Sequence, residues 1–64
     1  MSDDYTDVLV TVVRLSERAA LLEVDGEQEW VPFSLLGGGL AERHVGQTLT
    51  VEIAAWKAEE MGWV

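Results

Sequence analysis

The sequence predicts a mainly β protein in which four strands form a curled antiparallel sheet or a partly open small barrel, with a short helix at the C-terminus. Three observations predict this fold class. Runs rich in apolar and β-branched residues are separated by short polar turns. An Asp-Gly pair stands between two of these runs. The last segment combines helix-forming residues with a glycine near its end.

The first predicted strand covers residues 8–15, which read VLVTVVRL. Both alternating sets of side chains are apolar and mostly β-branched, a pattern typical of a strand that is at least partly covered on both faces. The preceding residues 1–7 include Asp3, Asp4 and Asp7. We therefore expect an acidic N-terminal tail over residues 1–7, followed by one small β domain over residues 8–64.

A second apolar run covers residues 19–24 and follows a short polar segment. A helix over residues 16–23 is an alternative, because Ser16 can cap it and the Glu, Arg, Ala and Leu that follow favour helix. We prefer a strand, because the run leads directly into Asp25-Gly26, a strong short-range signal for a tight hairpin. The third predicted strand is then residues 27–31.

The segment after the third strand is predicted to be a loop. Pro32 cannot donate a backbone hydrogen bond, so it ends the strand or marks a sheet edge. Three consecutive glycines at 37–39 act as a connector, because the lysine and the helix that follow the glycines of a phosphate-binding loop are missing. The next strand, residues 48–53, alternates polar with apolar residues, which predicts that Leu49, Val51 and Ile53 face the core.

Helix formers occupy residues 54–61, and Gly62 stands where such a helix would end. We expect Trp56 to point inward from this helix and Trp30 to pack in the core, with Trp63 beyond the helix. Four strands joined by short turns and closed by a helical turn are typical of SH3-like and OB-like small barrels.

Composition indicates one folded domain without disulfide bonds. The chain has 64 residues, 48% of them hydrophobic, and no cysteine. A chain of this size buries only about 60% of the surface that its unfolded form exposes, so packing or self-association must stabilise it. The N-terminus has no secretion signal, and no apolar run approaches the roughly 20 residues of a membrane-spanning helix. We therefore expect a soluble, cytoplasmic protein without a membrane partner.

Side chains suited to catalysis are scarce. His44 is the only histidine and cysteine is absent, so the nucleophile-and-base pairs of serine and cysteine hydrolases lack their parts. The acidic residues around the hairpin do not follow the ligand register of a calcium-binding loop. We expect His44 to be a solvated side chain, and we expect no enzyme activity, no cofactor and no metal site.

Charge is the strongest functional signal in the sequence. Twelve acidic residues stand against four basic ones, for a formal net charge of −8. Direct binding to nucleic acid is disfavoured, because that affinity comes from Lys and Arg. An acidic patch instead attracts basic surfaces and can compete with nucleic acid for them. The residues expected to contact such a partner are Asp25, Glu27, Glu29, Glu23, Asp3, Asp4 and Asp7.

Several short motifs resemble those of a family of short phage and mobile-element domains. The matching segments read SERA at 16–19, VDGE at 24–27, WVPFS at 30–34 and WKAEE at 56–60. Phe33 stands where the family pattern Trp-Ile-Pro-Lys-Ser carries lysine. The resemblance implies a small β fold. In size and charge the chain is also similar to small acidic anti-CRISPR proteins, several of which look like DNA to the complex they block.

The leading functional prediction is a non-enzymatic, phage-type inhibitor or adaptor. It would place an acidic face on the basic groove of a host nucleic-acid-binding complex, such as a CRISPR surveillance complex. Two alternatives stay open. An accessory single-stranded nucleic-acid-binding domain would use Trp63, Phe33 and Arg43. A structural module would form a homodimer through an unprotected sheet edge and exposed tryptophan.

Overall fold

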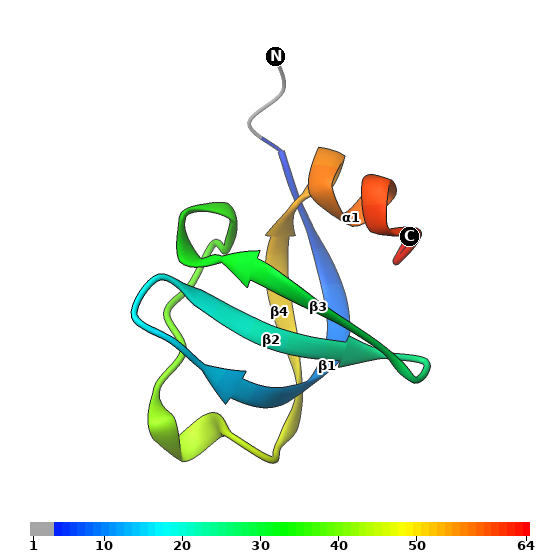
Figure 1. Cartoon of the computed structure of the whole chain (residues 1–64). Coiled ribbons are helices and arrows are strands. Elements are labelled where there is room, and N and C mark those ends of the chain that lie inside the picture. Colours follow the sequence, from blue (N-terminus) through cyan, green and yellow to red (C-terminus); the bar gives the residue numbers. More distant parts are fainter. Residues whose placement is uncertain (1–3) are drawn as a thin grey trace.

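The computed structural model describes residues 4–64, which form one curled antiparallel sheet with the strand order β3-β2-β1-β4 and a C-terminal helix (Figure 1). The elements are β1 Tyr5–Leu15, β2 Ala19–Val24, β3 Glu27–Pro32, β4 Thr48–Ala54 and α1 Ala55–Met61. Two short 3-10 turns, Phe33–Leu35 and Glu42–His44, lie between β3 and β4. The sheet does not close on itself. The predicted fold class is confirmed.

Strand β1 holds the sheet together because it is long enough to pair with two neighbours. From Tyr5 to Thr11 it pairs with β4, and from Thr11 to Leu15 it pairs with β2. The register with β2 shifts between Val12 and Arg14, which marks a bulge. A bulge bends its strand and increases the local twist. The curvature of β1 in Figure 1 is consistent with this bend.

The hairpin between β2 and β3 turns at Asp25 and Gly26, as predicted. Both residues have positive φ, 52° and 84°. This combination is typical of a type I′ turn, whose twist matches the twist of the flanking strands. Glycine adopts such a φ without steric cost and aspartate tolerates it, so the dipeptide fixes the register along all of β2 and β3.

A tight turn joins β1 to β2, so the alternative helix over residues 16–23 is wrong. The Ser16 hydroxyl donates to the Ala19 carbonyl at 3.0 Å and accepts the Ala19 amide at 3.1 Å. The Ser16 amide donates to the same carbonyl at 2.8 Å. Serine therefore caps a turn here, because its hydroxyl satisfies backbone groups that a helix would otherwise pair.

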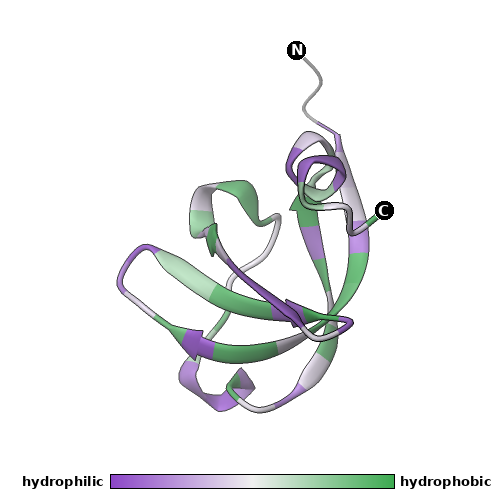
Figure 2. Cartoon of the chain, turned by 45° about the vertical axis from the view of Figure 1, so that its right-hand side comes forward, coloured by the Kyte–Doolittle hydropathy of each residue, from purple (hydrophilic) through white to green (hydrophobic). Residues whose placement is uncertain are grey.

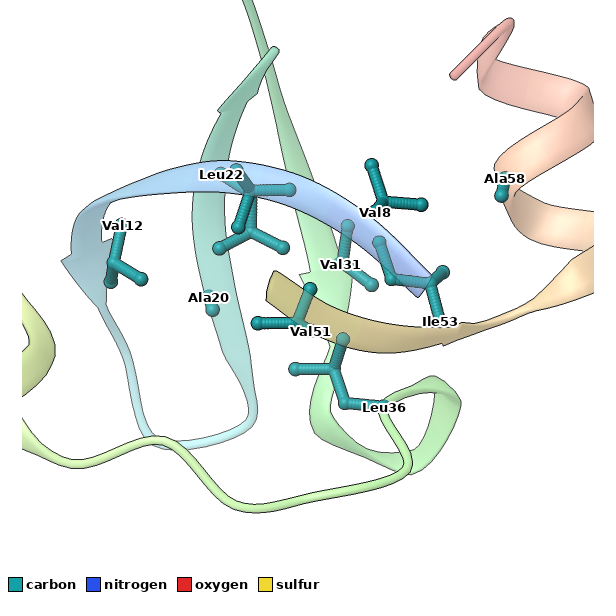
Figure 3. Packing of buried hydrophobic residues seen from close by; sticks show 10 residues of the cluster. Val8, Val12, Ala20, Leu22, Val31, Leu36, Val51, Ile53 and Ala58 are labelled. Atoms are coloured by element: carbon teal, nitrogen blue, oxygen red, sulfur yellow. The ribbon is translucent and has the colours of Figure 1, made fainter. Parts of the chain in front are cut away.

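The hydrophobic core lies on the inner face of the curled sheet. Successive side chains of a strand point to opposite faces, so alternate residues of each strand reach the core. Val51 and Ile53 are buried and Leu49 packs against them, as predicted. Figure 3 shows the converging side chains. The buried cluster is Val8, Val10, Val12, Ala20, Leu22, Val31, Leu36, Val51, Ile53 and Ala58.

The connection between β3 and β4 covers part of the open side of the curl. Leu36 is buried and forms an isolated antiparallel bridge with Ile53. The next amide, that of Gly37, donates to the Glu52 carbonyl at 2.8 Å. Phe33 and Leu40 are half-buried and pack against the core cluster. This segment therefore occupies the place next to β4 that a further strand would take in a closed barrel.

Helix α1 docks on the sheet through a small residue. Ala58 is fully buried, whereas Trp56 is 47% exposed. Two helical positions correspond to about 200° of rotation, so these two side chains point in nearly opposite directions. The helix ends at Gly62, where the Trp63 amide donates to the Ala58 carbonyl at 2.9 Å. The predicted helix is confirmed, but the prediction that Trp56 points inward is wrong.

Trp30 also lies outside the core, contrary to the prediction. Val31 stands opposite Ala20 on the inner face, so strand alternation places its neighbour Trp30 on the outer face, opposite Leu21. Trp30 is 43% exposed. Trp63, in contrast, is half-buried and packs against the core cluster. Two of the tryptophans thus belong to the surface.

Candidate acidic interaction surface

The predicted hairpin carboxylates gather at one end of the sheet but lie on two of its sides. Glu29 stands directly opposite the buried Leu22, so Glu29 and Glu27 lie on the inner side of the edge strand β3. Glu23 lies on the outer side, and Asp25 is in the turn. Figure 2 shows the hydrophilic colour over this turn and the first half of β3.

These carboxylates are accessible to a partner. Asp25, Glu27 and Glu29 are exposed. Glu23 is half-buried, and its Oε1 accepts a hydrogen bond from Gln28 Nε2 at 3.0 Å. Within residues 4–64 none of the four makes an ion pair. No cationic side chain within the described residues neutralises these charges, so a basic surface can replace the surrounding solvent.

Of the three N-terminal aspartates, the structure describes Asp4 and Asp7. Asp3 lies outside the described residues. Asp4 is exposed, and its carbonyl accepts the Ala55 amide at 2.9 Å. Asp7 belongs to β1, which begins at Tyr5 and not at residue 8. The additional pairing follows from β4, whose backbone offers partners as far as Ala54.

Asp7 has a neighbour that sequence reasoning missed. It stands directly opposite Glu52 of β4, on the outer face of the sheet. The alternation of residues 48–53 contained a signal for Glu52, because Glu52 lies between the core residues Val51 and Ile53 and must point outward. The signal was incomplete, since the pairing of β1 with β4 cannot be inferred from either strand alone.

The two acidic groups lie apart. Glu23 is opposite Thr11 of β1, and Asp7 lies four residues before Thr11 in the same strand. At about 3.4 Å per residue this separation is roughly 14 Å. Figure 1 likewise shows the start of β1 beside α1 at the top of the view, whereas the β2–β3 turn projects at the lower right. The acidic residues thus form a hairpin group and an N-terminal group, linked only across the outer face.

The outer face also carries exposed apolar side chains. Leu9 is 63% exposed, Tyr5 47% and Trp30 43%. The prediction that β1 is covered on both faces is therefore wrong at Leu9, because no element within residues 4–64 covers this side chain. Nothing in the sequence distinguishes Leu9 from Val8 and Val10, which are buried.

The glycine-rich loop borders two shallow hollows. One, of about 410 Å³, is lined by Phe33, Leu36 and residues 37–40. The other, of about 170 Å³, lies between residues 38–40, His44 and β4. In the described part of the chain, no three His, Asp or Glu side chains come close enough to hold a metal ion.

His44 is a structural residue of this loop, whereas we expected a solvated side chain. Its Nδ1 accepts the Ala41 amide at 2.8 Å, and its own amide donates to the Ala41 carbonyl at 2.8 Å. This reciprocal pair closes the 3-10 turn Glu42–His44. With Nδ1 occupied as an acceptor, only Nε2 is left to meet a ligand.

Replacing His44 by alanine should loosen the loop without unfolding the sheet. The variant loses one exposed hydrogen bond, which corresponds to about 0.5–1 kcal/mol of the free energy of unfolding. Amide hydrogen exchange at Ala41 should accelerate in His44→Ala, and His44→Asn should restore much of the protection because its side-chain oxygen can accept the same amide. Unchanged exchange at Ala41 in His44→Ala would contradict this role.

The alternative nucleic-acid surface is less exposed than the acidic one. Trp63 and Phe33 both pack against the core cluster, which leaves little of either ring for stacking on a base. Arg43 is exposed on the second 3-10 turn.

The fold and its surfaces define a small, acidic, curled-sheet domain whose outer face carries exposed apolar and acidic side chains. Comparison of the chain with protein-family models, with curated proteins and with solved structures finds no match. The resemblance to phage and mobile-element domains therefore stays a prediction. Within residues 4–64 no helix has the length and apolar character needed to cross a membrane.

Proposed function

We propose that this protein is a non-enzymatic binding module that docks acidic surface onto a basic surface of another macromolecule. The observation that carries the proposal is a net charge of −8 combined with exposed hairpin carboxylates that have no ion-pair partner within residues 4–64. A strongly charged small protein is steered toward a surface of opposite sign, and the rate of encounter falls as salt is added.

The partner that best fits this chemistry is a nucleic-acid-binding complex with a basic groove. Lysines and arginines that line such a groove are spaced to neutralise phosphates, and clustered carboxylates present the same sign of charge to them. The protein then acts as a phage-type inhibitor in the cytoplasm of a bacterial host, with a CRISPR surveillance complex as the first target to examine. The similarity in size and charge to small anti-CRISPR proteins supports the same choice.

A competition experiment tests the proposal. A purified surveillance complex is titrated onto fluorescently labelled target DNA, and anisotropy reports DNA binding at increasing concentrations of this protein. We expect the protein to displace DNA, with an inhibitory concentration that rises steeply with salt. The double variant E27Q/E29Q should inhibit about tenfold less well, because two charges of the contact are removed without a change in shape.

A matched control separates a local contact from net charge. The variant E59Q/E60Q removes two adjacent, exposed carboxylates of α1 and changes the net charge by the same amount. If both double variants weaken inhibition equally, the hairpin is not a specific contact. If the wild-type protein leaves DNA binding unchanged in every basic complex examined, the proposed function is wrong.

A further inference from the structure

The outer face of the sheet holds two facing carboxylates of like charge. Asp7 and Glu52 are direct cross-strand partners, and residues in this position have Cβ atoms about 5 Å apart. Like charges directly opposite each other destabilise a sheet. Within residues 4–64 neither carboxylate makes an ion pair. A cation placed between them from outside the chain would remove this repulsion.

The pair lies beside exposed apolar side chains. Leu9 and Asp7 are two residues apart in β1 and share the outer face, and Thr50 stands opposite Leu9. Leu9 is 63% exposed, although it lies in the middle of the longest strand. Further along this face Leu21 stands between Trp30 and Arg14. The face therefore presents apolar positions separated by carboxylates.

At the far end of the outer face, the side chains of neighbouring strands are hydrogen-bonded to one another. Thr11 Oγ1 and Thr48 Oγ1 are hydrogen-bonded at 2.8 Å, and Gln28 Nε2 donates to Glu23 Oε1 at 3.0 Å. These bonds hold the side chains of one cross-strand row in place, so little side-chain freedom is lost when a partner covers them. The surface as a whole is mixed in polarity, as protein interfaces usually are.

We propose that the outer face is a further docking surface beside the hairpin carboxylates, and that it takes a basic amphipathic polypeptide segment. An apolar side chain of the segment covers Leu9, while a lysine or arginine reaches between Asp7 and Glu52. This inference rests on the proposed function and names the partner of the same acidic protein. The partner is thus a protein segment that combines apolar and basic residues, and at high salt charge alone does not suffice to bind it.

Charge complementarity argues against a second copy of this chain as the occupant. Two outer faces in contact would bring Asp7 and Glu52 of one copy against acidic residues of the other, and each copy has a net charge of −8. Arg14 is the one basic side chain that the register places on this face within the described strands. Sedimentation of the free protein should accordingly show a monomer at high concentration and low salt.

Two synthetic peptides test the proposal by calorimetric titration into the 64-residue chain. One forms a helix with leucines on one side and lysines on the other. Its companion has equal length and charge but serine in place of every leucine. At low salt both should bind, and at high salt only the leucine peptide should keep measurable affinity, because salt screens exposed charges and not apolar contact.

Variants of matched exposure locate the contact. Leu9→Ala should weaken binding of the leucine peptide about tenfold and leave the serine peptide unaffected. Val64→Ala is the control, because Val64 is 64% exposed, close to the exposure of Leu9, and lies at the C-terminus. Asp7→Asn should weaken both peptides and at the same time raise the melting temperature of the free protein by about 2–4 °C, because it removes the like-charge pair.

The outcomes separate this inference from the proposed function. Equal effects of Leu9→Ala and Val64→Ala, or a dimer built through the outer face, would overturn the docking surface. Loss of peptide binding in E27Q/E29Q with full binding in Leu9→Ala would move the contact to the hairpin and leave the proposed function standing. If neither basic peptide binds the wild-type protein at low salt, the docking surface is overturned, and the DNA competition experiment alone decides the proposed function.

Discussion

Replacing Leu22 by alanine is expected to lower the free energy of unfolding by about 2–5 kcal/mol, because the substitution leaves a cavity in the centre of the core. Leu22 is fully buried and is among the largest of the fully buried side chains. It lies in β2, which has a paired strand on each side, so the backbone cannot easily collapse into the cavity. A 64-residue domain has a total stability of roughly 3–10 kcal/mol, so this one change removes a large part of it.

Leu9→Ala is the matched control for Leu22→Ala. The same atoms are removed from another strand of the sheet, but from a side chain that is 63% exposed. We expect a change within about 0.5 kcal/mol, as for most surface substitutions. Urea unfolding followed by tryptophan fluorescence measures both variants. Similar losses in the two variants would contradict the assignment of inner and outer faces, on which the proposed docking surface also depends.

Replacing Gly37 by alanine is expected to cost about 1–3 kcal/mol, the usual range for a side chain forced into packed surroundings. A Cβ atom at this position would lie 2.9 Å from Glu52 Cβ and 3.4 Å from Tyr5 Cδ1. Glu52 Cβ is attached directly to the backbone of β4 and cannot turn aside. The backbone bridge between Leu36 and Ile53 would have to open. The segment around Leu36 would then no longer cover its side of the core.

Gly38→Ala supplies the comparison for Gly37→Ala. A Cβ atom at Gly38 would meet nothing within 4 Å. Alanine there should leave stability unchanged or raise it by up to about 1 kcal/mol, because it restricts the unfolded chain. Thermal unfolding of the two variants side by side checks the expectation. Equal melting temperatures would show that the loop does not pack against β4 in solution.

The Gly37→Ala variant also tests the docking surface. Gly37 lies against the side chain of Glu52, which is one half of the facing carboxylate pair. A shift of Glu52 in Gly37→Ala should therefore alter binding of a basic peptide even where the protein stays folded. Because Gly37 has no side chain, it does not obstruct access to Glu52 from this edge of the sheet. A long basic side chain can therefore reach the carboxylates of Asp7 and Glu52.

Local signals in the sequence determined most of the secondary structure. Asp25-Gly26 predicted the hairpin because few other residues accept positive φ at both turn positions. The alternation of residues 48–53 predicted the face of Val51 and Ile53, and helix formers ending at Gly62 predicted α1. Each of these signals acts within a few residues, so no knowledge of the partner strands was needed. The net charge of −8 likewise follows from composition alone.

Tertiary structure alone decided which side chains are covered and which acidic residues meet. β1 is apolar on both alternating sets, and only the position of the other elements buries Val8 and exposes Leu9. Trp30 was expected inside because it is large and apolar, but its register opposite Leu21 places it outside. Asp7 and Glu52 are 45 positions apart in the sequence and adjacent in the sheet. Periodicity assigns residues to faces of a strand, whereas the choice of the covered face and of the neighbouring strand depends on how the whole chain closes around its core.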